Sequence, residues 1–365
     1  MHRIAAVAAF CLACVACDQR ESTEQPPQPI VNVYNWYNYV DPAALSAFTG
    51  ESRIAVNYDT FDSDQILEAK LLAGNSGYDV VVPSYAYFAR QIATGVFREI
   101  DRNRLPHYRE VDPYLLDQLA VADPGNRYGV PHAWGTTGLA VNVDAIRQRM
   151  PDAPLDSWAL IFDPDTVRHF QDCGVTMLDA PADVVTSMLI FLGRDTSSHT
   201  DADLDAAIAA IARVRPYVRY FHSSQSTDDL ANGEICLALM WSGDAYQAMH
   251  ANPQLNLKYV LPKEGAGLWF DVWAIPADAT NTDSAYRFID YMLRPDVAAG
   301  FTNATFYASG DGPDHTGVDA RLRGEPAIYP PNEIKHRLFS PPPETVEYER
   351  RRTRLWTALK AGSST

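Results

Sequence analysis

The chain has 365 residues, of which 47% are hydrophobic and 21% are charged, a globular composition with enough chain for two domains. Its formal net charge of −16 would repel nucleic acid and anionic membrane surfaces at long range and would attract a cationic ligand. Many soluble proteins are acidic for solubility alone, so charge by itself identifies no ligand.

Residues 1–16 are predicted to form a signal peptide, because Arg3 precedes an apolar run that is too short to span a bilayer. The sequence Cys14-Val15-Ala16-Cys17 is similar to a bacterial lipobox, with cysteine where leucine is usual. Cys17 is therefore the expected lipid anchor, with plain signal cleavage as the alternative. Residues 17–29 are rich in Pro and Gln and are expected to form an extended tether. The mature protein is predicted to be periplasmic and held at the inner membrane by this lipid.

Strands and helices alternate in the segment that follows, and short polar caps separate them. Asp41 and Pro42 suit the cap and first position of a helix that ends at Gly50, and Ser63 suits a second cap. The expected order is strand 31–36, helix 42–50, strand 54–61, helix 63–72, strand 79–82 and helix 87–94. Such alternation is typical of a sheet of the parallel α/β type.

A second series of elements begins after Gly135. It is expected to comprise strand 138–142, helix 203–214, strand 235–240, a crossing segment formed by 260–262 and 271–275, and helix 283–293. No internal repeat and no Gly/Ser linker separates the two series. The predicted fold is α/β, with two lobes joined by crossover strands and a ligand cleft between them. Lobe 1 would comprise 30–133 plus 262–310 and lobe 2 would comprise 134–261 plus 311–365, with hinges near 132–135 and 259–262.

Besides the expected anchor Cys17, two cysteines follow the predicted signal peptide, Cys173 and Cys236. In an oxidising compartment such a pair is expected to form one disulfide. Two thiols without histidines at ligand spacing make a zinc site the weaker alternative. No metal site and no cofactor are expected.

Enzyme motifs are nearly absent: there is no phosphate loop, no GxSxG elbow, no HExxH and no GxGxxG after a strand. Aromatic residues instead stand beside carboxylates or amides at predicted strand ends, where open α/β sheets bind ligands. Any one of these groups could be core packing, but four together favour a binding site. They are Trp36-Tyr37-Asn38-Tyr39, Trp241-Ser242-Gly243-Asp244, Trp269-Phe270-Asp271 and Phe306-Tyr307.

Ordered matches along residues 30 to 360 resemble the periplasmic putrescine/spermidine receptors of polyamine ABC importers, a type of extracellular solute-binding protein. The matching segments are Tyr34-Asn35-Trp36 with Tyr39, Phe61-Asp62-Ser63, Val81-Val82-Pro83-Ser84, Leu178-Asp179-Ala180-Pro181, Phe221-His222-Ser223-Ser224-Gln225, Trp241 with Gly243-Asp244, Phe270-Asp271-Val272, Phe306-Tyr307-Ala308 and Ile328-Tyr329-Pro330-Pro331.

This resemblance implies a ligand site in which carboxylates face amine groups and aromatic rings cover the methylenes. Asp244 and Asp271 would face ammonium or secondary amine groups, and a disulfide between Cys173 and Cys236 would be typical of the putrescine branch. The implied ligand-binding residues are Trp36, Asn38, Tyr39, Ser84, Asp183, Trp241, Asp244, Trp269, Asp271 and Tyr307.

Departures from the family pattern concern ligand preference. Asn38 stands where an acid is usual, Tyr37 replaces a small hydroxyl residue, and Asp183 stands where Glu is common. Trp269 resembles the spermidine receptors, whereas Ala180 resembles the putrescine type. We expect spermidine as the preferred ligand, because Trp269 could cover a longer chain.

The expected function is capture of spermidine or putrescine and delivery to an ABC permease and its ATPase, without catalysis. Ligand binding would close the hinge, and the closed form would dock on the permease. The chain is expected to be a monomer that binds no nucleic acid. The alternatives are a receptor for another organic cation, such as agmatine or cadaverine, and an exported glycosidase, since aromatic rings and paired carboxylates also serve sugars.

Overall fold

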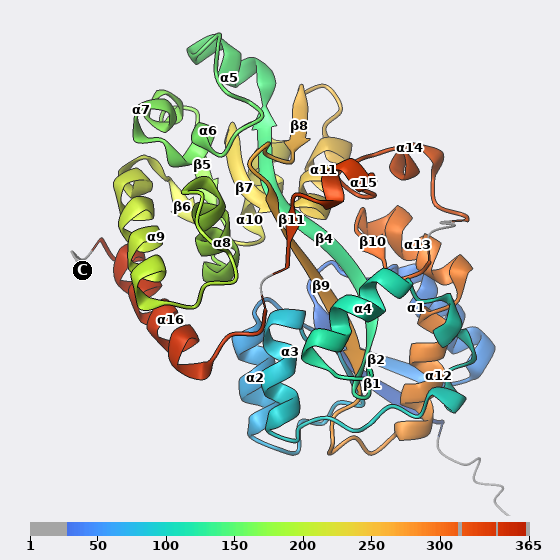
Figure 1. The fold of residues 1–365 in the computed structure, drawn as a ribbon. Coiled ribbons are helices and arrows are strands. Elements are labelled where there is room, and N and C mark those ends of the chain that lie inside the picture. Colours follow the sequence, from blue (N-terminus) through green and yellow to red (C-terminus); the bar gives the residue numbers. More distant parts are fainter. Residues whose placement is uncertain (1–27, 313–315, 341, 363–365) are drawn as a thin grey trace, which may run out of the picture.

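A computed structural model describes residues 28–312, 316–340 and 342–362 (Figure 1). The predicted signal peptide, the Cys17 anchor and nearly all of the expected tether therefore lie outside the described residues. In the part of the chain that the structure describes, no helix is long and apolar enough to cross a membrane.

The first lobe is built on the predicted strand and helix alternation. Its strands and helices are β1 (Ile30–Trp36), α1 (Pro42–Ser52), β2 (Ala55–Phe61), α2 (Asp64–Leu72), β3 (Val80–Val81), α3 (Tyr85–Ala93), η1 (Arg102–Arg104), η2 (Pro106–Glu110), α4 (Pro113–Ala122), α12 (Thr282–Met292), α13 (Pro295–Thr305) and β10 (Ala308–Ser309). Strand β1 pairs in parallel with β2 and with β3. Its side chains Val31 and Val33 are fully buried in the core beneath α1 and α12, so the strand is fixed by both pairing and burial.

Helix α1 begins as predicted, because the Asp41 carboxylate accepts a hydrogen bond from the Ala43 N–H and Pro42 occupies the first turn. It ends at Ser52 rather than at Gly50, and Arg53 closes it in a left-handed conformation with φ of 63°. Helix α3 starts at Tyr85, two residues before the predicted position, with Ser84 as its N-cap residue.

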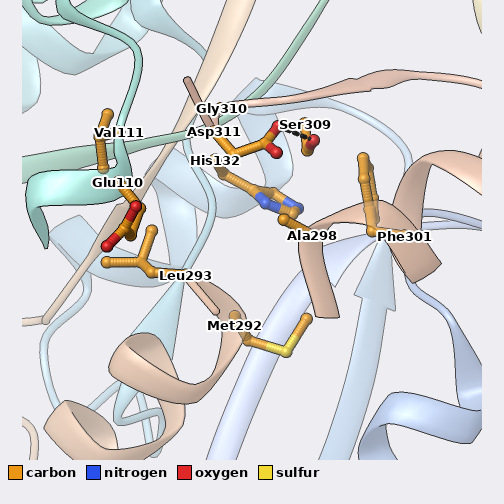
Figure 2. A pocket seen from close by; sticks show the side chains of 10 residues that line it. All are labelled: Glu110, Val111, His132, Met292, Leu293, Ala298, Phe301, Ser309, Gly310 and Asp311. Atoms are coloured by element: carbon orange, nitrogen blue, oxygen red, sulfur yellow. Dashed lines mark hydrogen bonds between the residues drawn. The ribbon is translucent and has the colours of Figure 1, made fainter. Parts of the chain in front are cut away.

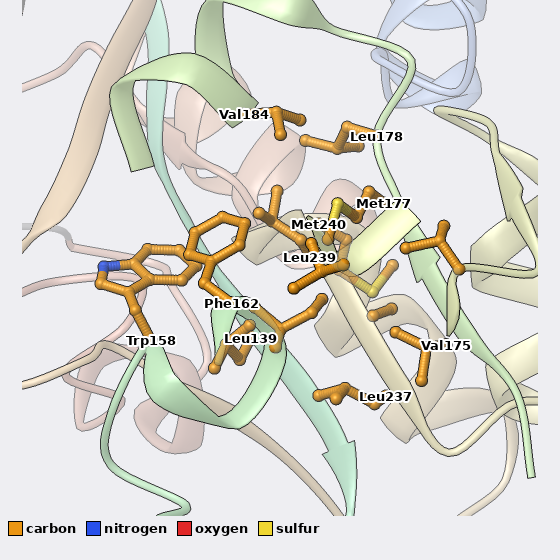
Figure 3. Close-up of a cluster of buried hydrophobic side chains, with 14 of the residues drawn as sticks. Leu139, Trp158, Phe162, Val175, Met177, Leu178, Val184, Leu237, Leu239 and Met240 are labelled. Atoms are coloured by element: carbon orange, nitrogen blue, oxygen red, sulfur yellow. The ribbon is translucent and has the colours of Figure 1, made fainter. Parts of the chain in front are cut away.

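The second lobe has its own hydrophobic core, in which the rings of Trp158 and Phe162 pack against Leu139, Met177 and Leu239 (Figure 3). Its elements are α5 (Val143–Arg149), α6 (Ala159–Phe162), α7 (Pro164–Val167), η3 (Arg168–Phe170), β5 (Val175–Met177), α8 (Pro181–Phe191), α9 (Asp201–Val214), η4 (Arg215–Tyr217), β6 (Tyr220–Phe221), α10 (Gln225–Ala231), β7 (Leu237–Trp241), α11 (Ser242–Ala251), β8 (Leu257–Val260) and α16 (Val346–Lys360).

The predicted disulfide is confirmed between Cys173 and Cys236, whose Cα atoms are 5.5 Å apart. It joins the turn before β5 to the residue before β7, and these two strands pair in parallel. The crosslink therefore ties together the starts of two neighbouring strands of the second lobe.

Two long strands join the lobes, β4 (Gly129–Asn142) and β9 (Ala266–Ala274), which pair antiparallel from Gly129 to Thr137 of β4. The strand order is β2-β1-β3-β9-β4-β7-β5-β6, so the first-lobe and second-lobe strands lie on either side of this pair (Figure 1). The sheet is mixed rather than purely parallel, because β9 runs antiparallel to β3 and β4 runs antiparallel to β7. The lobe boundaries set out above stay a prediction.

Strand β4 begins nine residues before the predicted start at Gly138, because its first half is stabilised by β9 and not by a local sequence pattern. Strand β8 pairs only with the last residues of β4, from Leu139 to Asn142. The strand that accompanies β4 along most of its length is therefore β9, which follows the segment 259–262 where a hinge was expected.

After β10 the chain crosses between the lobes once more. It passes through α14 (Ala320–Arg323), α15 (Asn332–Lys335) and β11 (Leu338–Phe339), which pairs in parallel with the first residues of β9. Helix α16 then buries Tyr348, Trp356 and Leu359 in the core of the second lobe, next to α9 (Figure 1). Strand β4, strand β9 and the segment that contains β11 thus connect the two lobes.

Candidate functional site at the junction of the lobes

Five predicted ligand-binding residues are aromatic, and the structure brings their side chains into one cluster. Trp36 ends β1, Tyr39 lies in the turn that follows, Trp241 ends β7, Trp269 lies within β9, and Tyr307 follows α13. The ring of Tyr307 is 5.2 Å from that of Tyr39 and 5.3 Å from that of Trp269, and the two indoles of Trp241 and Trp269 are 6.2 Å apart. All three contacts are edge-to-face, so the cluster has several differently oriented ring faces.

Trp269 does not end its strand, contrary to the sequence-based expectation. It sits inside β9 opposite Gly135 of β4. A Cβ atom at Gly135 would lie 2.5 Å from the Trp269 ring, so the glycine gives the indole room to lie across the neighbouring strand. Gly243 has the same role for Tyr307, because a Cβ atom there would also lie 2.5 Å from the ring.

The turn after β1 is held by two side-chain hydrogen bonds. The Asn35 amide donates to the carbonyl oxygen of Tyr39 at 3.0 Å, and the Trp36 indole N–H donates to the carbonyl oxygen of Val82 at 2.9 Å. These bonds fix Trp36 and Tyr39 at the cluster. Asn38 adopts a left-handed conformation with φ of 53° and is exposed, so the structure does not bring it into the buried cluster. Tyr37 is 61% exposed.

Two predicted carboxylates lie in the first turns of second-lobe helices. Asp244 of α11 accepts a hydrogen bond from the Tyr307 hydroxyl at 2.6 Å. Asp183 of α8 accepts hydrogen bonds from the Thr137 hydroxyl at 2.6 Å and from the Trp241 indole at 3.2 Å. Burial raises the pKa of Asp244 to about 6, and burial also raises the pKa of Asp183.

The third predicted carboxylate, Asp271, comes from the middle of β9 and is only 5% exposed. Burial, followed by the charge of the nearby Asp64, raises its pKa well above the usual range. Ser84 lies opposite Asp271 through a β-bridge. The Tyr39 hydroxyl is buried close to the Asp271 carboxylate, and burial followed by the charge of Asp271 raises the pKa of this hydroxyl.

Sequence reasoning missed a fourth carboxylate in this region, that of Asp64. It accepts a hydrogen bond from the Ser84 N–H at 3.1 Å and another from the Ser84 hydroxyl at 2.7 Å. The sequence placed Ser63 and Asp64 only at the start of a helix, where an acid is common for local reasons. The contact with Ser84 spans 20 positions, so it is a product of the tertiary fold.

No ion pair among the described residues includes any of these four carboxylates, Asp64, Asp183, Asp244 and Asp271. Burial raises the pKa of Asp183, and the charge of Arg352, whose own guanidinium is paired with Glu344, offsets only part of this rise. The group therefore combines acceptors for several cationic donors with aromatic faces that suit methylene chains.

Behind the aromatic cluster, His132 of β4 is buried against the rings of Trp273, Phe301 and Tyr39. Figure 2 shows it beside a cavity of about 10 Å³ that Glu110 and Asp311 also line. Burial lowers the pKa of His132 to about 3, so the imidazole is neutral at physiological pH. His132 therefore supports the rings and adds no cation beside the carboxylates.

Comparisons with known proteins agree with this arrangement. Residues 43–310 match the model of the bacterial extracellular solute-binding protein family. Over 331 residues the chain is 43% identical to the putrescine-binding periplasmic protein PotF of Escherichia coli K12, with 89% of each protein covered. It is 41% identical over 329 residues to the putrescine-binding periplasmic protein SpuD of Pseudomonas aeruginosa, covering 89% of this chain and 90% of SpuD.

Among solved structures, the fold is similar to that of the spermidine/putrescine ABC transporter substrate-binding protein PotD from Streptococcus pneumoniae. The TM-score is 0.75 at 25% sequence identity, over 92% of this chain and 99% of that one. The chain therefore belongs to the bacterial extracellular solute-binding protein family, in the group that contains these periplasmic proteins.

Proposed function

We propose that this protein captures a linear polyamine in the periplasm and delivers it to the permease and ATPase of an ABC importer. One observation carries the proposal: four carboxylates that form no ion pair within the described part of the chain lie beside a cluster of five aromatic side chains, where the two lobes meet. The names of the relatives support the same ligand class.

A linear polyamine needs what these residues offer. A charge-assisted hydrogen bond to a carboxylate contributes about 1.5–3 kcal/mol, and a cation held against an aromatic face adds about 0.5–2 kcal/mol. Tyr39 comes from the first lobe, Asp271 from the connecting strand β9, and Asp183 and Trp241 from the second lobe, so a ligand bound between them would hold the lobes together. Ligand binding would thereby favour the closed form that docks on the permease.

Preference between polyamines depends on a few residues of the site. Trp269 offers a larger face than Phe would, which favours a longer ligand. PotF and SpuD, at 43% and 41% identity, are however named for putrescine. We propose spermidine as the preferred ligand and putrescine as a weaker one. A lipid on Cys17 would hold the receptor at the inner membrane, and a monomer would suffice for this function.

Titration calorimetry of the purified protein with putrescine, spermidine, cadaverine and agmatine tests the proposal. Saturable one-to-one binding of spermidine, tighter than that of putrescine, is the expected result. Tighter binding of putrescine would reverse the proposed preference but not the ligand class. Binding of agmatine or cadaverine alone would identify a different organic cation as the ligand. No binding of any of the four would refute the polyamine assignment.

A further inference from the structure

Asp64 lies on the first-lobe side of the site, at the first position of α2. Both of its carboxylate oxygens are hydrogen-bonded to Ser84, one by the backbone N–H and the other by the hydroxyl. Ser84 is in turn bridged to Asp271 in β9. Only Ser84 therefore separates the Asp64 carboxylate from Asp271, a predicted ligand-binding acid. The hydrogen bonds from Ser84 leave lone pairs on both Asp64 oxygens for a further donor.

Within the described residues, no ion pair joins Asp64 to a cation. Arg90 acts on it only at a distance, because the guanidinium of Arg90 is held by Glu68 at 2.6 Å and by Glu349 at 3.2 Å. Asp183 and Asp271 add charges of the same sign nearby. Burial raises the pKa of Asp64 to about 6, so the carboxylate is largely ionised at neutral pH although it is poorly solvated.

A second polar group lies on the same side of the site. The Tyr39 hydroxyl belongs to a side chain that is only 4% exposed, and it lies close to the Asp271 carboxylate. A ligand nitrogen near Asp271 would supply a donor to this hydroxyl and a positive charge to the carboxylates around it.

We propose that Asp64 is a ligand-binding carboxylate of this site and that it selects polyamines with at least three positively charged nitrogens. The inference rests on the proposed function. A diamine can neutralise only two of the four carboxylates, and the remaining negative charges repel each other or must bind protons. A third ammonium group neutralises one more, so the charge of Asp64 should increase the affinity for a triamine more than that for a diamine.

The substitution Asp64→Asn removes the charge while keeping the shape of the side chain. Its amide oxygen can still accept the hydrogen bond from the Ser84 N–H, and its NH₂ group can donate to the Ser84 hydroxyl, which can serve in either role. Asp62→Asn is the matched control, because Asp62 is exposed and stands two residues earlier. Both variants change the net charge of the protein equally.

Calorimetric titrations of wild type and both variants with spermidine and putrescine give the test. We expect Asp64→Asn to weaken spermidine binding by about tenfold and putrescine binding by less than about threefold, with no change in Asp62→Asn. Melting curves without ligand show whether the variant is folded. An equal loss for both ligands would mean that Asp64 only positions Ser84, and it would overturn the inference, as would an unchanged ratio of the two affinities.

These titrations also separate the proposed function from the role of Asp64. If wild type binds neither amine, the proposed function falls. If wild type binds both and Asp64→Asn keeps the same preference, only the role of Asp64 falls. Wild type that binds putrescine but not spermidine would overturn the selection for three charges and leave the polyamine class intact.

Discussion

Replacing Asp271 by Asn tests the electrostatics of the proposed site most directly. The side chain is 5% exposed, so an ammonium group bound there would exchange most of its water for protein. Loss of a charge-assisted hydrogen bond costs about 1.5–3 kcal/mol, and a buried cation left without its anion costs about 3–5 kcal/mol. At about 1.4 kcal/mol per factor of ten, we expect the Kd for spermidine to rise by about 100-fold, and by at least about tenfold.

The same substitution should not destabilise the unliganded protein. Burial raises the pKa of Asp271, so its ionised form is less favourable in the folded protein than in the unfolded chain at neutral pH, and an uncharged side chain removes that cost. We therefore expect calorimetry to record a large loss of affinity while the Tm without ligand is unchanged or higher. Asp62→Asn is again the control. Unchanged affinity in Asp271→Asn, or a Tm that falls together with the affinity, would refute this reasoning.

Three more results are expected. Burial raises the pKa of Asp244 to about 6, so this carboxylate is anionic above that pH and binds a proton below it. Spermidine affinity should therefore fall from pH 7 to pH 5. A pH-independent affinity in calorimetry would contradict this. Gly243→Ala should displace the Tyr307 ring and weaken spermidine binding by about tenfold in the same assay. Gly50→Ala is the control, because a Cβ atom there meets nothing within 4 Å, and it should bind spermidine normally. Equal affinities of the two variants would argue against a role for the Tyr307 ring. Replacing Cys173 and Cys236 by Ser should lower the free energy of unfolding in urea by about 2–4 kcal/mol and leave the Kd for spermidine nearly unchanged. An unaltered urea midpoint would show that the crosslink does not stabilise the protein.

Local patterns in the sequence determined much of the first lobe. The alternation of β-branched strands with capped helices predicted β1, α1, β2 and α2 to within a few residues, because caps and hydrophobic periodicity are short-range signals. The sequence also indicated the cysteine pair and the groups of aromatic and acidic residues, since these depend only on residue types and their order. Resemblance to the polyamine receptors then indicated which of those residues should meet.

Long-range pairing decided what these signals could not. The first half of β4 contains Gly129, Pro131 and His132, which are poor strand signals, and it is a strand because β9 pairs with it. For the same reason Trp269 lies inside a strand instead of at its end. Asp64 could be predicted as the first residue of a helix, but its place beside Ser84 and Asp271 required the packing of α2 against α3 and the sheet. Hydrogen bonds and charge interactions depend on distance in space, and that distance was set by the tertiary fold.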